Sequence, residues 1–339
     1  MIIRSYPENF ASALEPVVYT MDAVRLDAWL GANLDIMQHG QSTPVGTKRF
    51  YKGSKLSINI APYALACLNI LPYKSGNQLI QATGRTAKMY LTTDGELSEV
   101  RHIAAGRMTL PVGVLLSDRA LRCIAPGEFD EFSFIAPEGD VWAEFSVSDA
   151  KGLRYSWRMP PFVSDGGMVV CPVDMRVIAR MVADEVGLAV GDINKVKVVI
   201  YFGSDAAFEV NYVVEAATAQ GVRLAWISRY GTVECYTFPI CTERKLATKR
   251  LGETQSGDGV TFPLVEAWQE QTISSGLLPS TTVQCLSDIV VAPKVWQWKD
   301  GSWGECNIMD SSVVTHNVDE PSVVRLTVRD SKNVKTKTL

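Results

Sequence analysis

The stretch 222–239, VRLAWISRYGTVECYTFP, predicts a β-hairpin that organises the rest of the chain. Successive side chains of a strand point to opposite faces of a sheet, so Leu224 and Trp226 share one face. Arg229 and Tyr230 precede Gly231, which supplies the turn because glycine tolerates a positive φ. Bulky side chains stand on both faces of the two arms, which indicates a hairpin buried on two sides, as at the join of two packed modules.

The remaining chain is rich in short strand patterns and poor in helix patterns. Residues 131–135 and 141–147 are apolar stretches separated by a Pro-Glu-Gly-Asp turn, a spacing typical of β-sandwiches. A second hairpin is expected around the Asp-Gly turn at 300–301, and 323–328 is expected to be the terminal strand. The predicted fold class is mainly β, with tandem antiparallel β-sandwich-like domains.

Three domains are predicted, over 1–108, 109–218 and 219–339. Aligning Gly53 with Gly166, an offset of 166 − 53 = 113, places a strand followed by a short helix over a similar strand and helix. The first helix is expected at 63–71. The second is expected after Asp174, a good N-cap, with an apolar stripe formed by Met175, Ile178, Met181, Val182 and Val186. A period of more than a hundred residues indicates duplicated domains, because solenoid repeats are shorter.

Composition narrows the function classes. The 339 residues are 47% hydrophobic with a net charge of −4, which fits a globular protein without an overall basic surface for nucleic acid. Residues 1–7 lack an apolar signal-peptide core and no apolar run is long enough to span a membrane, so neither export nor membrane insertion is expected. The seven cysteines form no C-x-x-C pair and the three histidines are far apart, so no metal or other cofactor is expected.

The hairpin pattern also carries a family resemblance. Leu-x-Trp-hydrophobic-x-Arg-Tyr-Gly, followed by Tyr-Thr-Phe at 236–238, resembles virion structural proteins of phages and prophages of Bacteroidetes bacteria. The segments 277–278, 286–289, 291–296 and 323–328 are compatible with that family, so the resemblance covers about the last third of the chain. It implies a β-rich building block of a tail, connector or baseplate, and it implies no catalytic residue.

Motifs for catalysis are missing from the sequence. It contains no phosphate-binding loop, no dinucleotide fingerprint and no nucleophile elbow. His39 lies in a polar loop pattern and His102 in a strand pattern, where a surface or packing role is the commoner outcome. The densest carboxylate group could serve glycoside cleavage, which needs two facing carboxyl groups, but it is interpreted as a solvated strand edge. Its members are Glu128, Asp130, Glu131, Glu138 and Asp140.

Six aromatic residues are the candidate interface or glycan-facing residues: Trp226, Tyr230, Tyr236, Trp296, Trp298 and Trp303. Flat aromatic faces stack on sugar rings or on partner proteins, although core filling is the commoner role in a β-rich chain.

The preferred interpretation is a non-enzymatic virion protein that forms a homo-oligomeric ring in a phage tail, connector or baseplate, made in the host cytoplasm. It would contact neighbouring virion proteins, with chain ends that become ordered on assembly. The alternatives are a carbohydrate-binding adhesin module that uses Trp296, Trp298 and Trp303, and a β-rich enzyme that uses the carboxylate group.

Overall fold

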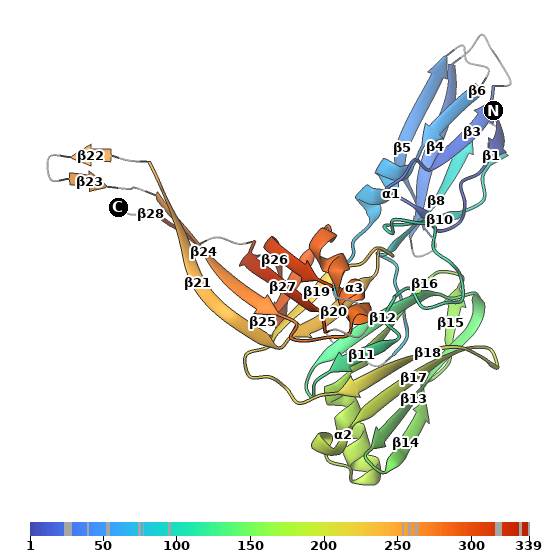
Figure 1. The fold of residues 1–339 in the computed structure, drawn as a ribbon. Coiled ribbons are helices and arrows are strands. Elements are labelled where there is room, and N and C mark those ends of the chain that lie inside the picture. Colours follow the sequence, from blue (N-terminus) through green and yellow to red (C-terminus); the bar gives the residue numbers. More distant parts are fainter. Residues whose placement is uncertain are drawn as a thin grey trace. The chain divides into compact units, whose positions relative to one another are not determined.

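The computed structural model describes the chain except for residues 24–28, 39–40, 52–54, 74–75, 77, 94–95, 253, 257–258, 262–263, 316–320, 332–333 and 338–339. His39, Gly53, Asp94 and Gly95 lie outside the described residues. The chain forms two compact units. Unit 1 comprises Met1–Arg122, Gly127–Val213 and Ser228–Val233, and unit 2 comprises Cys123–Pro126, Val214–Ile227 and Glu234–Leu339. Both consist mainly of antiparallel strands, as the sequence predicts, and the boundaries near 108 and 218 stay a prediction (Figure 1).

The first half of unit 1 is a two-sheet sandwich, named here the first module (residues 2–104). Its elements are β1 (Ile2–Ser5), β2 (Ala11–Ser12), β3 (Val18–Asp22), β4 (Trp29–Gln38), β5 (Gln41–Tyr51), β6 (Lys55–Asn59), α1 (Ala61–Cys67), β8 (Thr86–Thr93), β9 (Glu96–Leu97) and β10 (Arg101–Ala104). One sheet has the order β1-β3-β6 and the other β2-β10-β8-β4-β5, with β9 paired to β8. Tyr19 and Ile58 from the first sheet meet Leu34 and Leu91 from the second in one core.

The second module (residues 121–214) follows the same plan. Its elements are β11 (Leu121–Ile124), β12 (Phe129–Ile135), β13 (Glu138–Asp149), β14 (Gly152–Arg158), β15 (Phe162–Asp165), β16 (Met168–Asp174), α2 (Met175–Val186), the 3-10 helix η1 (Val190–Asp192), β17 (Lys195–Phe202) and β18 (Asp205–Val214). One sheet has the order β12-β16-β7, where β7 (Ile80–Gln81) comes from the chain that follows the first module's helix. The other has the order β11-β18-β17-β13-β14, with β15 paired to β13.

The two modules share one strand connectivity. In the first, β3 pairs with β6, β4 pairs with β5 and β8, and β8 pairs with β10. In the second, β12 pairs with β16, β13 pairs with β14 and β17, and β17 pairs with β18. In each module a helix directly follows a strand of the smaller sheet: α1 follows β6, and α2 follows β16. The strands β6 and β16 begin 168 − 55 = 113 residues apart.

Local chemistry explains where α2 begins and ends. The Asp174 carboxylate accepts a hydrogen bond from the Arg176 backbone N–H at 3.0 Å, which satisfies a donor that the first helical turn leaves open. Gly187 ends the helix with φ 66°, a conformation that glycine adopts without strain. Met175, Ile178 and Val182 are buried as predicted, whereas Val186 in the last turn is exposed.

Unit 2 contains both arms of the predicted hairpin, which belong to one large sheet. Its elements are β19 (Val222–Ile227), β20 (Val233–Phe238), β21 (Ile240–Leu251), β22 (Thr254–Ser256), β23 (Gly259–Thr261), β24 (Leu264–Ser274), α3 (Ser280–Leu286), the 3-10 helix η2 (Ser287–Val291), β25 (Val295–Lys299), β26 (Ser302–Val314), β27 (Val323–Asp330) and β28 (Val334–Lys337). The sheet order is β20-β19-β25-β26-β27-β24-β21, with β28 paired to β24. The sequence did not predict α3, which packs Val283 and Leu286 into the core of this unit.

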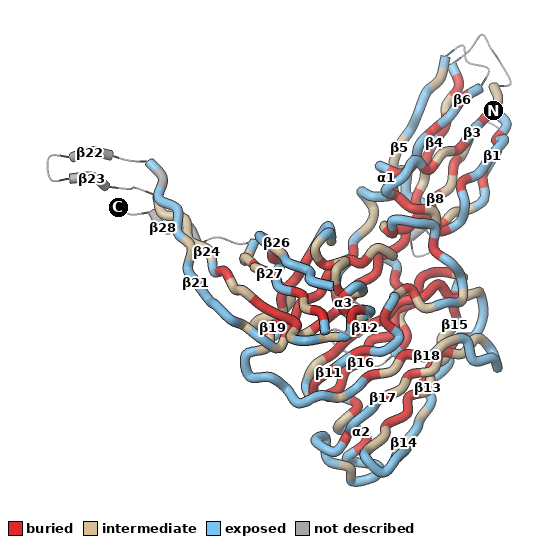
Figure 2. The backbone as a smooth tube through the Cα atoms, viewed as in Figure 1, coloured by how far each residue is buried: buried red, intermediate tan, exposed pale blue. Residues whose placement is uncertain are grey.

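The hairpin prediction is confirmed in its main features. Leu224 and Trp226 lie in one core with Tyr236 and Phe238 from the opposite arm. All six residues of β19 are buried, so the strand is covered on both faces (Figure 2). Gly231 has φ 70°, and a Cβ there would lie 2.5 Å from the Gly106 backbone nitrogen, so the turn requires glycine.

The two chain ends differ from the sequence-based expectation. Residues 2–5 form β1, which pairs with β3 and buries Met1 and Ile3, so the N-terminal segment is part of a sheet and not an arm. Near the other end of the chain, β28 pairs with β24. Backbone hydrogen bonding in a sheet orders such polar segments even where their composition favours disorder.

Candidate functional site

The six predicted aromatic residues fall into three environments. Trp226, Tyr236 and Trp296 are buried within the chain, at 0%, 7% and 2% exposure. Their rings fill interior space and are not available to a partner. Trp298 and Trp303 face each other across the β25–β26 hairpin and remain half-buried, with ring centroids 5.2 Å apart at 67°. An edge-to-face pair of this kind is not the flat platform on which a sugar ring stacks.

Tyr230 has a structural role in the hairpin turn. Its hydroxyl donates a hydrogen bond to the Asp118 carboxylate at 2.8 Å, and the same carboxylate forms an ion pair with Arg229. Burial raises the pKa of Tyr230, so the hydroxyl stays protonated and able to donate. The Arg229 carbonyl accepts from the Arg107 N–H at 2.7 Å, which further fixes the turn within unit 1.

The solvated-edge interpretation of the carboxylate group was wrong for Asp130 and Glu131, whereas Glu138 and Asp140 at the start of β13 are exposed. Asp130 and Glu131 are 3% and 2% exposed on β12, a strand whose seven residues are all buried. Asp130 pairs with Arg122 at 3.1 Å, and Glu131 pairs with Arg85. The local sequence around Asp130 and Glu131 does not predict their burial, because both arginines come from other segments of the chain.

The Glu131 carboxylate is bound by a backbone N–H and by a buried arginine. One carboxylate oxygen accepts from the Tyr73 N–H at 2.8 Å, and the other faces the Arg85 guanidinium. Arg85 also donates to the Ser133 hydroxyl at 3.1 Å and to the Leu71 carbonyl at 2.9 Å. Burial raises the pKa of Glu131, and the Arg85 charge opposes that rise. These contacts tie the segment before β8 to β12 and leave the carboxylate directed at protein groups, not at an open cleft.

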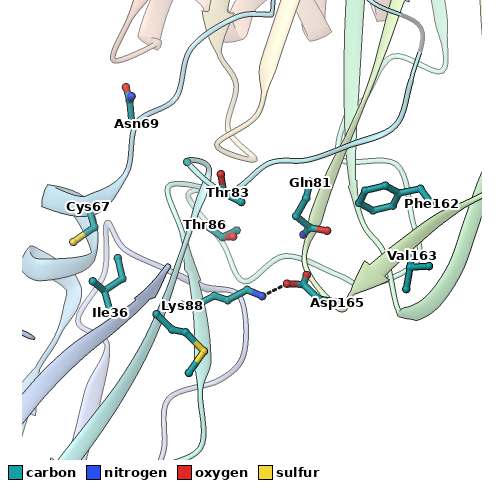
Figure 3. A pocket seen from close by; sticks show the side chains of 12 residues that line it. Ile36, Cys67, Asn69, Gln81, Thr83, Thr86, Lys88, Phe162, Val163 and Asp165 are labelled. Atoms are coloured by element: carbon teal, nitrogen blue, oxygen red, sulfur yellow. Dashed lines mark hydrogen bonds and ion pairs between the residues drawn. The ribbon is translucent and has the colours of Figure 1, made fainter. Parts of the chain in front are cut away.

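A cavity of about 630 Å³ lies in unit 1 between residues of the two modules (Figure 3). Its wall includes an ion pair between Lys88 on β8 and Asp165 on β15. The other lining residues are Ile36, Met37, Cys67, Asn69, Gln81, Thr83, Gly84, Thr86, Phe162 and Val163. Burial raises the pKa of the Cys67 thiol, so it is a poor nucleophile. The cavity therefore holds mixed polar and apolar walls without an activated nucleophile among the residues that line it.

His102 is buried near this cavity, at 7% exposure, with its ring 4.8 Å from that of Phe10. Its backbone N–H donates to Asn9 at 2.8 Å, and its Nδ1 atom has no hydrogen-bond partner among the described residues. Burial, together with the nearby Lys88 charge, lowers the pKa of His102 from 6.5 to about 4. The ring is therefore neutral at pH 7, in agreement with the packing role that the sequence favoured.

Acidification is expected to destabilise the fold through His102. Between pH 6.5 and pH 4 the unfolded chain binds a proton that the folded chain does not, so stability present above pH 6.5 is lost as the pH falls. The loss should reach about 2–3 kcal/mol at pH 4.5. In His102→Gln this titration is removed, and the drop in urea midpoint between pH 7 and pH 4.5 should shrink. An unchanged drop would contradict the assignment.

Sequence inspection missed two aromatic stacks on the outward sheet faces of unit 1. Trp142 on β13 stacks on Tyr201 of β17 with centroids 3.9 Å apart at 2°. Trp29 on β4 stacks on Tyr51 of β5 with centroids 4.8 Å apart at 27°. Trp29 and Tyr51 are 66% and 48% exposed. Each pair joins residues distant in the sequence, so only the strand pairing could reveal it.

The described residues contain no group of three or more His, Cys, Asp or Glu side chains arranged to hold a metal ion. Among the described helices, none combines the length and the apolar character needed to cross a membrane. No protein-family model and no curated protein matches this chain.

Proposed function

We propose that this protein is a non-enzymatic structural component of a phage virion, which assembles through protein–protein contacts as a ring or collar of the tail, connector or baseplate. The observation that carries the assembly part is the repeated β-sandwich module whose outward sheet face exposes a tryptophan at 66% in the first copy. Exposed aromatic side chains on a rigid sheet are typical of protein interfaces. The assignment to a phage rests on the resemblance of residues 224–238.

The distribution of ionisable groups supports a structural role. Asp130 and Glu131, the centre of the carboxylate group, are neutralised by buried arginines. Two facing carboxyl groups in an open cleft, as glycoside cleavage requires, are not formed by this buried pair, because successive residues of a strand point to opposite faces. The Arg85–Glu131 pair joins the two modules, and the Arg122–Asp130 pair lies within the second module.

The native mass of the purified protein tests the proposal. We expect light scattering and negative-stain microscopy to show a closed ring whose mass is a whole multiple of 37.2 kDa. A closed ring follows from heterologous contacts that meet after one full rotation. A protein that remains a monomer at millimolar concentration, and that is absent from purified virions of its host's phage, would contradict it.

The alternative function, a carbohydrate-binding adhesin, is supported by the partial exposure of Trp298 and Trp303. If the protein captured glycans on an array and lost that binding after Trp298→Ala and Trp303→Ala, the adhesin function would replace the structural one. We expect no glycan binding, because the third tryptophan of the proposed platform, Trp296, is buried.

A further inference from the structure

The two outward tryptophans stand at equivalent positions of the duplicated module. Trp29 on β4 and Trp142 on β13 are 142 − 29 = 113 residues apart, the same offset that relates β6 to β16. Each is followed by a core residue, Leu30 in the first module and Ala143 in the second, so both indoles point away from the sandwich core. One module can therefore be compared with the other as an internal reference.

In the second module, the Trp142–Tyr201 stack is in contact with an arginine that is itself paired with a glutamate of the same module. The Arg158 guanidinium carbon lies 4.1 Å from the centroid of the Trp142 ring, a cation–π contact. Arg158 also donates from Nε to the Glu144 carboxylate at 2.9 Å. Arg158 stands directly opposite Glu144 in the pairing of β14 with β13, so the strand register itself creates this contact.

The first module has the same strand register at this place but no carboxylate, and its tryptophan stacks on Tyr51 of β5, the strand that carries Arg49. Gly31 occupies the position of Glu144, since 144 − 31 = 113, and Arg49 stands opposite Gly31 in the pairing of β5 with β4. Among the described residues, no hydrogen bond or ion pair involves the exposed Arg49 side chain. A Cβ placed on Gly31 would have no heavy atom within 4 Å, so the space that a glutamate would fill is open.

We infer that Trp29, Gly31 and Arg49 form a contact site for a second copy of this chain, which supplies the carboxylate that Glu144 supplies within the second module. The incoming carboxylate pairs with Arg49 in the space above Gly31, and the surface that carries it covers the Trp29 indole. Arginine and tryptophan are the residue types that contribute most at protein interfaces.

Charge favours a second copy as the occupant. The chain has 37 acidic and 33 basic residues, a net charge of −4, so its own surface offers carboxylates in excess. An arginine without an internal carboxylate is complementary to that surface. The inference rests on the proposed assembly function and names the surface through which the copies meet.

The decisive variant copies the second module into the first. Gly31→Glu places a carboxylate opposite Arg49, so the contact is satisfied within one chain and its place is no longer open to a partner. We expect Gly31→Glu to fold with an unchanged or raised urea midpoint, because glycine weakens a strand interior. Its self-association, measured by sedimentation velocity over a concentration series, should weaken at least about tenfold.

Two further variants remove the site, and one matched variant serves as control. Trp29→Ala and Arg49→Gln should each weaken self-association to a similar degree, while Arg158→Gln, which breaks the internal contact of the second module, should leave it unchanged. A wild-type assembly that persists in all three first-module variants overturns this inference and leaves a ring formed by other surfaces. A wild-type protein that does not self-associate overturns the second-copy occupant and removes the ring itself. Equal weakening in Arg158→Gln also contradicts the inference, since it would show a general effect of the sheet face.

Discussion

Replacing Arg85 with methionine is expected to lower the free energy of unfolding by about 3–5 kcal/mol, because it leaves the Glu131 carboxylate buried without its counter-charge. Both side chains are 3% exposed, so water cannot replace the lost guanidinium. The substitution also removes the hydrogen bonds to Ser133 and to the Leu71 carbonyl. Urea unfolding at pH 7, followed by circular dichroism, measures the effect.

A surface ion pair of the first module, between Arg4 and Asp22, provides the control. Arg4 and Asp22 are 2.7 Å apart but 59% and 39% exposed, so Arg4→Met should cost less than about 1 kcal/mol. The double variant Arg85→Met with Glu131→Gln should recover part of the loss, since a neutral amide still accepts from the Tyr73 N–H. Equal effects of Arg85→Met and Arg4→Met would show that the buried pair does not hold the segment before β8 to β12.

Truncating Trp226 to alanine is expected to destabilise the chain by about 3–5 kcal/mol, whereas Trp298→Ala should cost about 1 kcal/mol. Trp226 is fully buried in the core of unit 2, and its removal leaves a cavity among Leu224, Tyr236 and Phe238. Trp298 loses mainly its edge-to-face contact with Trp303. The urea midpoints of the two variants, both in unit 2, are directly comparable.

The comparison separates packing aromatics from surface aromatics. If Trp226→Ala were as mild as Trp298→Ala, the two-sided burial of the hairpin would not stabilise the fold. If Trp298→Ala proved the more damaging, the half-buried pair would belong to a second core. Either result would change which of the six predicted aromatics is available to a partner.

The repeated module shows which structural features the pattern of a single sequence can predict. The offset of 113 residues placed strand over strand and helix over helix, and the structure has the same connectivity in both stretches. Alternating apolar positions, such as Leu30, Ala32 and Leu34, specify which face of a strand enters the core. This alternation does not specify which strand lies beside a given strand, so the Trp29–Tyr51 and Trp142–Tyr201 stacks could not be predicted from the sequence.

Buried charge was the largest failure of sequence reasoning. Asp130 and Glu131 follow Glu128 in a segment rich in acidic residues, and acidic side chains are usually exposed to water. Here Arg122 and Arg85 reach them from 8 and 46 residues away, which makes burial tolerable. A partner that arrives from elsewhere in the chain leaves no local signal.

The mainly β class, the hairpin at 222–239 with its glycine turn, the N-cap of α2 and the repeated order of strands and helix could all be predicted from the amino-acid sequence. Each of these depends on neighbours within a few residues, through side-chain alternation, φ preferences and capping hydrogen bonds. The folded chain was needed to show which acidic residues are buried, which tryptophans remain exposed, and that Arg49 lacks the carboxylate that Arg158 has. Those properties depend on which distant strands pair and in what register, and hydrophobic alternation does not encode that choice.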